Sequence, residues 1–306
     1  MIQHYKSLFI LLCLILPLGL SAQVESILNG IQLNQSVQTV TKKLAHTAGS
    51  VNVITIETPT FPLAKEKETH LVCSQLLTQN GTINKVVFTF ADDTLKYIEA
   101  RGNAVKVLTQ NRKDTARTYL DYEVYVAENL FLKKAADAAW ILTPEAMHVN
   151  LFTWENPYLD SGNKENTNKI GATQIPPFIK MGATLDEIKP VLEAHSAFTN
   201  TEELDGSDPN AQLQINCFGV EYLGFPRKLE ARFGNNTLNV VWILTGKGEE
   251  DRIRQALIAA YGAPVFENAE WEIYNDWQVG LRKDKPEVLL MEKSIGLGYK
   301  TNYFKQ

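Results

Sequence analysis

The residues of this chain best able to do covalent or metal chemistry are its histidines and cysteines, and they are sparse. His70 and Cys73 lie three residues apart, close enough in sequence for a thiol to meet a base. The same segment fits a β-strand, in which side chains three residues apart point to opposite faces. We therefore expect no Cys-His dyad here, and because no further ligands cluster nearby we expect no metal site.

The sequence also lacks the motifs that mark common enzymes and cofactor sites. It contains no G-x-S-x-G, H-E-x-x-H, C-x-x-C, phosphate-binding loop or dinucleotide-binding glycine pattern. The carboxylates of Asp92 and Asp93 are replaced by Asn235 and Asn236 at the matching place of a repeat described below, so turn geometry explains them. We expect no cofactor. A hydrolase that uses two carboxylates far apart in sequence remains the alternative function.

Aromatic residues supply the remaining candidates for binding. Trp154 and Tyr158 lie close together in the segment FTWENPYL. If they are exposed, such a pair can stack on a sugar ring or anchor a protein interface. The competing interpretation is that both side chains pack in the core or against a linker.

The predicted strands and helices that position these residues form an internal repeat, which occurs twice along the chain. KVVFTFADDTLKYIEARG (85–102) matches KLEARFGNNTLNVVWILTG (228–246), each a strand that ends in Phe, a polar pair, Thr-Leu and a second strand. Asp and Asn tolerate the positive φ of a tight hairpin. The match extends upstream to helices opening at Ser36 and Thr184, and the offset of about 145 residues is the size of one domain.

The order of the elements predicts an α+β fold. Each repeat is expected to form a mostly antiparallel sheet with about two helices packed on one face. A helix is predicted over 249–261, and its counterpart in the first copy is placed within 113–136. Trp140 and Trp271 are paired as matching residues, which favours a core role for both. We expect a first repeat over 23–158, a linker over 159–175 and a second repeat over 176–306.

Two cysteines, Cys73 and Cys217, occupy matching positions of the repeat. If their strands meet at an axis between the copies, they could form a disulfide, which an oxidising compartment permits. The alternative is that each thiol is a small buried apolar group in its own core. The sequence cannot choose between the two, because a bridge depends on the distance between the Cα atoms.

The first segment, MIQHYKSLFILLCLILPLGLSA (1–22), is typical of a secretory signal peptide. Lys6 provides the positive start, the run from Leu8 to Leu20 is apolar, and Ala22 is a small residue at a plausible cleavage point. We expect a secreted protein, periplasmic or extracellular, with no membrane span in its mature chain. The chain has 30 basic and 35 acidic residues and no basic stripe along a helix, which argues against nucleic acid as a partner.

Two short motifs resemble segments of known secreted bacterial proteins. GATLDEIKPVL (182–192) resembles the opening helix of outer-membrane assembly lipoproteins and of β-lactamase-inhibitor-type modules, and YGAP (261–264) before a Trp strand is similar to secreted Bacteroidota proteins. The chain departs from these groups, since it lacks the lipoprotein cysteine and separates its helices by strands. The resemblance implies a non-catalytic binding module of the bacterial envelope. The expected partner is a protein or a glycan, bound on a sheet face, between the repeats or at a strand edge.

Overall fold

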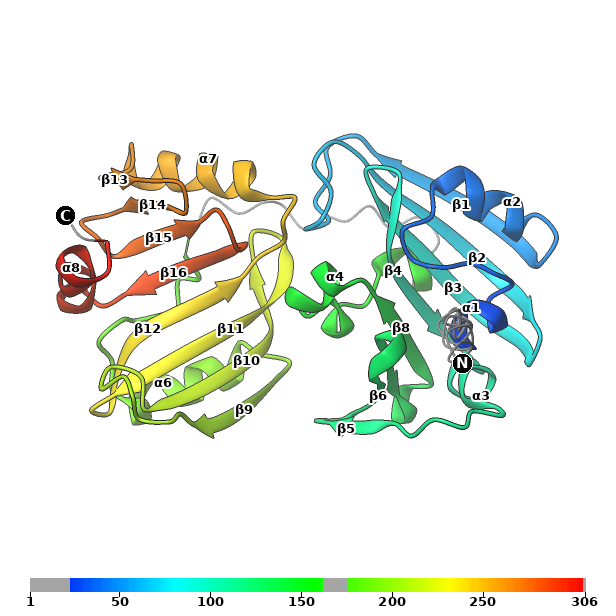
Figure 1. Ribbon diagram of the computed structural model, residues 1–306, viewed down its shortest axis with the longest axis horizontal. Coiled ribbons are helices and arrows are strands. Elements are labelled where there is room, and N and C mark those ends of the chain that lie inside the picture. Colours follow the sequence, from blue (N-terminus) through cyan, green and yellow to red (C-terminus); the bar gives the residue numbers. More distant parts are fainter. Residues whose placement is uncertain (1–22, 162–174, 305–306) are drawn as a thin grey trace, which may run out of the picture.

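The computed structural model describes residues 23–161 and 175–304. The expected leader, 1–22, lies outside these residues, as does most of the expected linker, 159–175. The described chain forms two eight-stranded antiparallel sheets, one after the other in sequence, each with helices packed on it (Figure 1). The predicted α+β class and the two tandem modules are confirmed.

The first module provides one sheet and the second module provides the other. In chain order the elements of the first module are α1 (Gln23–Ile27), α2 (Val37–Leu44), β1 (Ala48–Ile56), β2 (Glu68–Thr78), β3 (Gly81–Ala91), β4 (Thr94–Arg101), α3 (Ala104–Thr109), β5 (Arg117–Tyr119), β6 (Tyr122–Tyr125), β7 (Leu130–Lys133), β8 (Ala138–Leu142), α4 (Pro144–His148) and α5 (Pro157–Ser161). Those of the second are α6 (Leu185–Ala194), β9 (Phe198–Glu203), β10 (Leu213–Tyr222), β11 (Phe225–Gly234), β12 (Thr237–Leu244), α7 (Glu250–Tyr261), β13 (Phe266–Glu267), β14 (Trp271–Tyr274), β15 (Val279–Arg282), β16 (Glu287–Met291) and α8 (Lys293–Asn302).

The two sheets have the same topology. The first is ordered β1-β2-β3-β4-β8-β7-β6-β5, and the second, read from its other edge, is β9-β10-β11-β12-β16-β15-β14-β13. The register shifts at the same place in both, just before Phe90 in β3 and just before Phe233 in β11. A duplicated unit explains this agreement, because a bulge is a local feature that unrelated sheets would not place identically.

The local signals of the sequence are also confirmed. Asp92, Asp93, Asn235 and Asn236 all have positive φ, between 48° and 65°, as a two-residue hairpin turn requires. Ser36 caps α2 by accepting the Thr39 N–H, and Thr184 opens α6 in a capping box with Glu187.

Two assignments within the repeat were wrong. The second helix of the first module is α3, six residues long and upstream of 113–136, a range that holds strands β5, β6 and β7 instead. Trp140 lies in β8 and Trp271 in β14, which occupy different positions in their sheets. The correct match sets Tyr-Glu-Val-Tyr of β6 against Trp-Glu-Ile-Tyr of β14. The sequence comparison paired Trp140 with Trp271 because both are Trp. The true counterpart of Trp271 is Tyr122, since one large aromatic side chain can replace another in a core.

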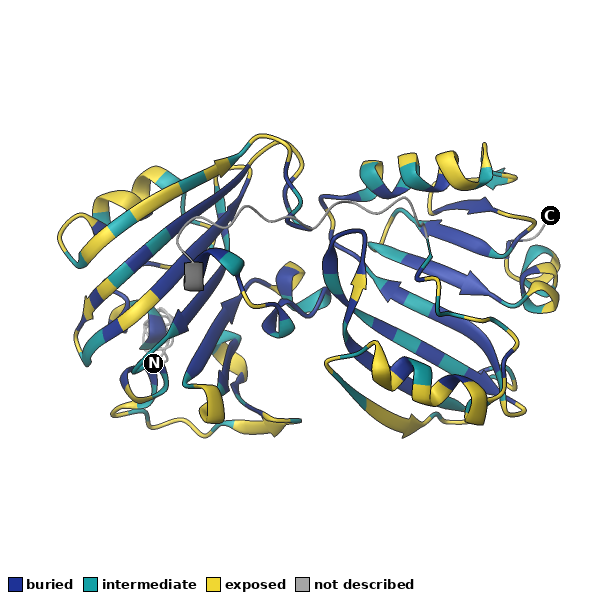
Figure 2. Ribbon diagram, turned by 180° about the vertical axis from the view of Figure 1, so that it is seen from behind, coloured by how far each residue is buried: buried dark blue, intermediate teal, exposed yellow. Residues whose placement is uncertain are grey.

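Each sheet buries one face beneath its helices. In the first module α1, α2 and α3 cover a core that contains Cys73, Phe88 and Leu95, and in the second α6 and α7 cover the core around Cys217 and Val241. Figure 2 shows the central strands largely buried and the outward sides of the helices exposed. In neither described range does any helix have the length and apolar character needed to cross a bilayer.

The two modules pack directly against each other. Arg252 of α7 donates to the carbonyl oxygens of Pro59 (2.8 Å) and Ala64 (3.2 Å) in the loop between β1 and β2. The Gly248 N–H donates to the Pro62 carbonyl, and a Cβ at Gly248 would lie 2.5 Å from a backbone carbon of Leu63. Such a close approach between the modules needs glycine at this position.

Candidate functional site

Each sheet has a second face, which points away from the helices that cover its core. This second face differs between the two modules. In the first module this face is packed shut by the chain that follows β8, which contributes Leu151, Phe152, Trp154 and Leu159. Phe218 and Phe225 of the second module complete the same cluster. The face therefore forms a shared core between the modules and leaves no open surface at its centre.

A polar network is enclosed within this core. His70 lies 2.6 Å from Glu68 through Nε2, while its Nδ1 faces the Thr89 hydroxyl and the Asn156 amide at 3.0 and 3.1 Å. Burial raises the pKa of Glu68, but the His70 contact and the backbone N–H groups of Phe61 and Thr60 outweigh it, so the net pKa is lowered. The network satisfies buried polar groups, as a structural role requires.

Glu99 and Tyr97 form the second buried polar group on this face. Burial raises the pKa of Glu99, and Arg101 opposes the shift. Burial also raises the pKa of Tyr97, and the adjacent Glu99 adds to the effect. Perturbed groups such as these mark active sites when they line a cleft. Here both residues are almost fully buried, so a substrate cannot reach either side chain.

Trp154 and Tyr158, the aromatic pair singled out in the sequence, belong to the same core. Their exposed fractions are 5% and 3%. Trp154 packs on Tyr97 and on Phe225 of the second module with ring centroids 5.0 and 4.9 Å apart, and Tyr158 packs 4.7 Å from His70. An exposed sugar platform is therefore wrong for this pair. Trp154 instead joins the two modules, which corresponds to the packing interpretation.

Cys73 and Cys217 are both free thiols. Each lies in the helix-covered core of its own module, so the matching strands do not meet and the disulfide is not formed. Burial raises the pKa of Cys73 to about 12 and that of Cys217 to about 11, which leaves both as inert thiols. Across the described ranges, no group of three or more His, Cys, Asp and Glu side chains could hold a metal ion.

The second module carries different residues on the corresponding face. Aligning Cys73 with Cys217 places Asn216 where the first module has Val72. Aligning Phe90 with Phe233 likewise places Glu230 where the first module has Val87. Val72 and Val87 both contribute to the shared core. Hydrogen-bonding side chains thus replace apolar ones at these two positions, whereas polar His70 and Thr89 stand at the positions of Gln214 and Arg232.

These side chains form a continuous set that we call the polar ladder. Its members come from three neighbouring strands: Glu202 of β9, Gln214 and Asn216 of β10, and Lys228, Glu230 and Arg232 of β11.

Each side chain of the polar ladder is hydrogen-bonded to at least one other member. Glu202 accepts from the amides of Gln214 and Asn216, both at 2.8 Å. The Arg232 guanidinium donates to Gln214 at 2.7 Å and to Glu230 at 2.9 Å, and Lys228 donates to Glu230 at 2.7 Å. Mutual bonding of this kind fixes rotamers before any ligand arrives.

Aromatic residues flank the polar ladder. Arg232 lies over Trp242 with its guanidinium 5.9 Å from the ring centroid, and Lys228 lies 5.7 Å from the ring of Phe218. Tyr119 of the first module, 42% exposed, stands close enough that Glu202 and Glu230 reinforce the effect of burial in raising its pKa. Both modules therefore contribute to the surroundings of the polar ladder.

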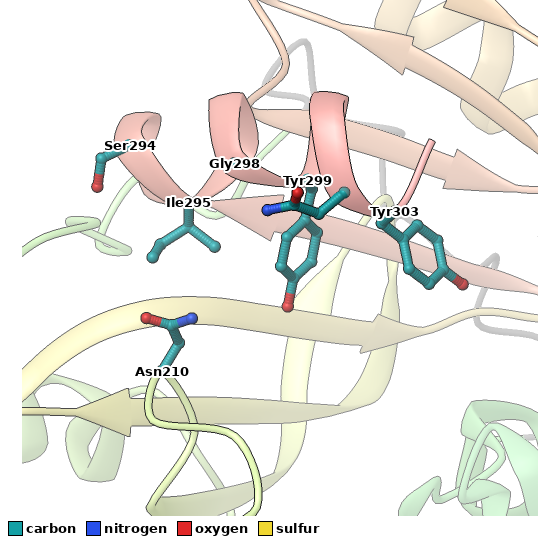
Figure 3. Close-up of a pocket in the computed structure, with 7 residues that line it drawn as sticks. Asn210, Ser294, Ile295, Gly298, Tyr299 and Tyr303 are labelled. Carbon is teal, nitrogen blue, oxygen red and sulfur yellow. The ribbon is translucent and has the colours of Figure 1, made fainter. Parts of the chain in front are cut away.

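A pocket of about 350 Å³ opens beside the polar ladder, between α8 and the loop that precedes β10. In Figure 3 the side chains of Ile295 and Tyr299 project from α8 toward Asn210 on that loop. Burial and the nearby Asp208 raise the pKa of Tyr299, while Arg232 opposes the shift. Tyr299 and Trp242 pack against the same apolar cluster, and Arg232 lies over Trp242, so the pocket lies next to the polar ladder.

Sequence reasoning did not identify either feature. Alternation along the sequence places Lys228, Glu230 and Arg232 on one face of a strand, but it does not show which residues of the neighbouring strands join them. Helix α8 was not predicted, since its two glycines weaken the helical signal. Comparison with known proteins finds no match to the chain among family models, curated proteins or solved structures.

Proposed function

We propose that this protein is a non-catalytic binding protein of the bacterial envelope that binds neutral glycans on the polar ladder of the second module. The observation that carries the proposal is the difference between matching faces. Val72 and Val87 pack into the shared core, while Glu230, at the position of Val87, is partly exposed and bonded to Lys228 and Arg232. The apolar leader sequence supports export to the envelope.

The composition of the polar ladder favours an uncharged ligand. Its two carboxylates are balanced by Lys228 and Arg232, and its two amides are neutral. A nucleic acid or an anionic membrane would need a surface of a single charge. Glycans instead present many hydroxyl groups, which suit the exposed carboxylate of Glu202 and the partly exposed guanidinium of Arg232.

The geometry supports binding more than hydrolysis. The carboxyl group with the raised pKa, Glu99, is enclosed in the shared core. The carboxylates of the polar ladder, Glu202 and Glu230, are both engaged as hydrogen-bond acceptors by neighbouring side chains. Such groups can orient a ligand by accepting hydrogen bonds, and the hydrolase alternative gains no support from them.

Replacing Glu202 by alanine is expected to weaken glycan binding about tenfold, which corresponds to ~1.4 kcal/mol. The substitution leaves the Gln214 and Asn216 amides without their common acceptor, so the polar ladder loses its fixed geometry. Binding is measured by calorimetry against cello-, chito-, xylo- and manno-hexaose, with polygalacturonate as an anionic comparator.

Glu203→Ala is the matched control, because this neighbour is exposed and alternation along β9 turns it to the other face. It is expected to bind as the unchanged protein does. Failure of the unchanged protein to bind any of the four hexaoses would contradict the proposed function. Capture of a protein partner through the polar ladder in place of a glycan would contradict it as well.

A further inference from the structure

The pocket beside α8 has hydrogen-bonding groups without partners. Its lining includes Asn210 and Asn302 with side-chain amides, and Tyr299 and Tyr303 with phenols. Within the described residues, none of these four side chains makes a hydrogen bond. Together these side chains offer several hydrogen-bond donors and acceptors in one concave place.

The shape and charge of the pocket also limit what can enter it. Its volume of about 350 Å³ lies at the lower end of the ~300–1,000 Å³ range of small-molecule sites. No lysine, arginine or carboxylate lines it, and Ile295 and the tyrosine rings add apolar surface. Tyr299 and Tyr303 lie close together, with ring centroids 5.9 Å apart.

We infer that this pocket holds one neutral sugar ring of the ligand, as a subsite continuous with the polar ladder. The inference rests on the proposed function. The amides of Asn210 and Asn302 bond the ring hydroxyls, and a tyrosine ring packs on its apolar face. The inference is restricted to a neutral ring because neither lysine nor arginine lines the pocket to pair with a sugar carboxylate.

A substitution of Gly298 can test this inference, because Gly298 lies on α8 and lines the pocket. A Cβ built at Gly298 meets nothing within 4 Å, whereas one built at Gly296 would lie 2.0 Å from the Trp277 carbonyl oxygen. Gly298→Leu therefore adds its Cβ without a clash, at a position that lines the pocket. Removing a glycine from a helix interior also favours folding.

The expected result is at least tenfold weaker binding of the tightest hexaose by Gly298→Leu, with a melting temperature no lower than that of the unchanged protein. Thr301→Leu is the matched control, since it adds leucine to an exposed position of α8 outside the pocket. Its affinity is expected to stay within twofold. Asn210→Ala removes one amide without adding bulk and is expected to weaken binding severalfold.

Three results would overturn the inference in different ways. If Gly298→Leu and Asn210→Ala both bind within twofold of the unchanged protein while Glu202→Ala is weakened, the pocket is no subsite and the polar ladder alone binds the glycan. If the unchanged protein binds no hexaose, the proposed function fails and the subsite fails with it. Tighter binding of polygalacturonate than of the hexaoses would contradict the neutral subsite.

Discussion

Replacing Glu249 by alanine is expected to lower the free energy of unfolding by about 3–5 kcal/mol. Glu249 stands at the start of α7, and its carboxylate is buried against Arg227, whose side chain is wholly buried. The two oxygens of Glu249 face the two terminal nitrogens of Arg227 at 2.7 and 2.8 Å. The loss is large because alanine would leave the guanidinium charge buried with no counter-ion.

Denaturant unfolding of Glu249→Ala measures this loss, and the adjacent Glu250→Ala provides the control. Glu250 is only partly buried, so its removal is expected to cost less than ~0.5 kcal/mol. A double variant, Arg227→Leu with Glu249→Ala, is expected to be more stable than Glu249→Ala alone, because it removes the uncompensated charge. Equal stability of Glu249→Ala and the unchanged protein would contradict the assigned role of the pair.

Replacing Trp154 by alanine is expected to cost about 3–5 kcal/mol of unfolding free energy. The indole fills the shared core between the modules, where it contacts Phe61, Tyr97 and Phe225. Alanine leaves a cavity there, since the surrounding rings belong to separate strands and loops and cannot all move inward. Glu155→Ala is the neighbouring control, because the Glu155 side chain is 70% exposed and its removal costs at most ~1 kcal/mol.

A double-mutant cycle between Trp154→Ala and Phe225→Ala tests whether this core joins the modules. The two rings lie 4.9 Å apart and come from different modules. Aromatic pairs in contact couple by about 0.5–1.5 kcal/mol, so the two losses are expected to be non-additive by that amount. Strict additivity of the two losses would mean that the modules do not share a core at this point.

Much of the fold could be predicted from the sequence because its signals are local. Asp92-Asp93 and Asn235-Asn236 fix two hairpins through the φ values they tolerate, and Thr184 with Glu187 fixes the start of a helix. A repeated set of such signals is enough to predict two similar modules. The hairpin turns that the duplication predicts at both polar pairs are confirmed.

The candidate site could not be predicted, because it depends on how the modules pack. Trp154 and Tyr158 are residue types that often bind sugars. They are buried only because Phe225 of the second module and the segment 151–159 pack around them. Cys73 and Cys217 match in sequence but lie in separate cores, a fact that depends on the direction each strand faces. Whether a sheet face is covered is a property of the tertiary structure.

Hydroxyl-radical footprinting with and without the tightest hexaose tests the central claim most directly, because it reports which sheet face meets the ligand. The account predicts that Tyr303, 55% exposed, is oxidised in the free protein and protected with Tyr299 when the hexaose binds. It predicts that Trp154 and Tyr158 stay unreactive in both states. Protection confined to the first module would contradict the account, and no change at the α8 tyrosines on binding would contradict the subsite.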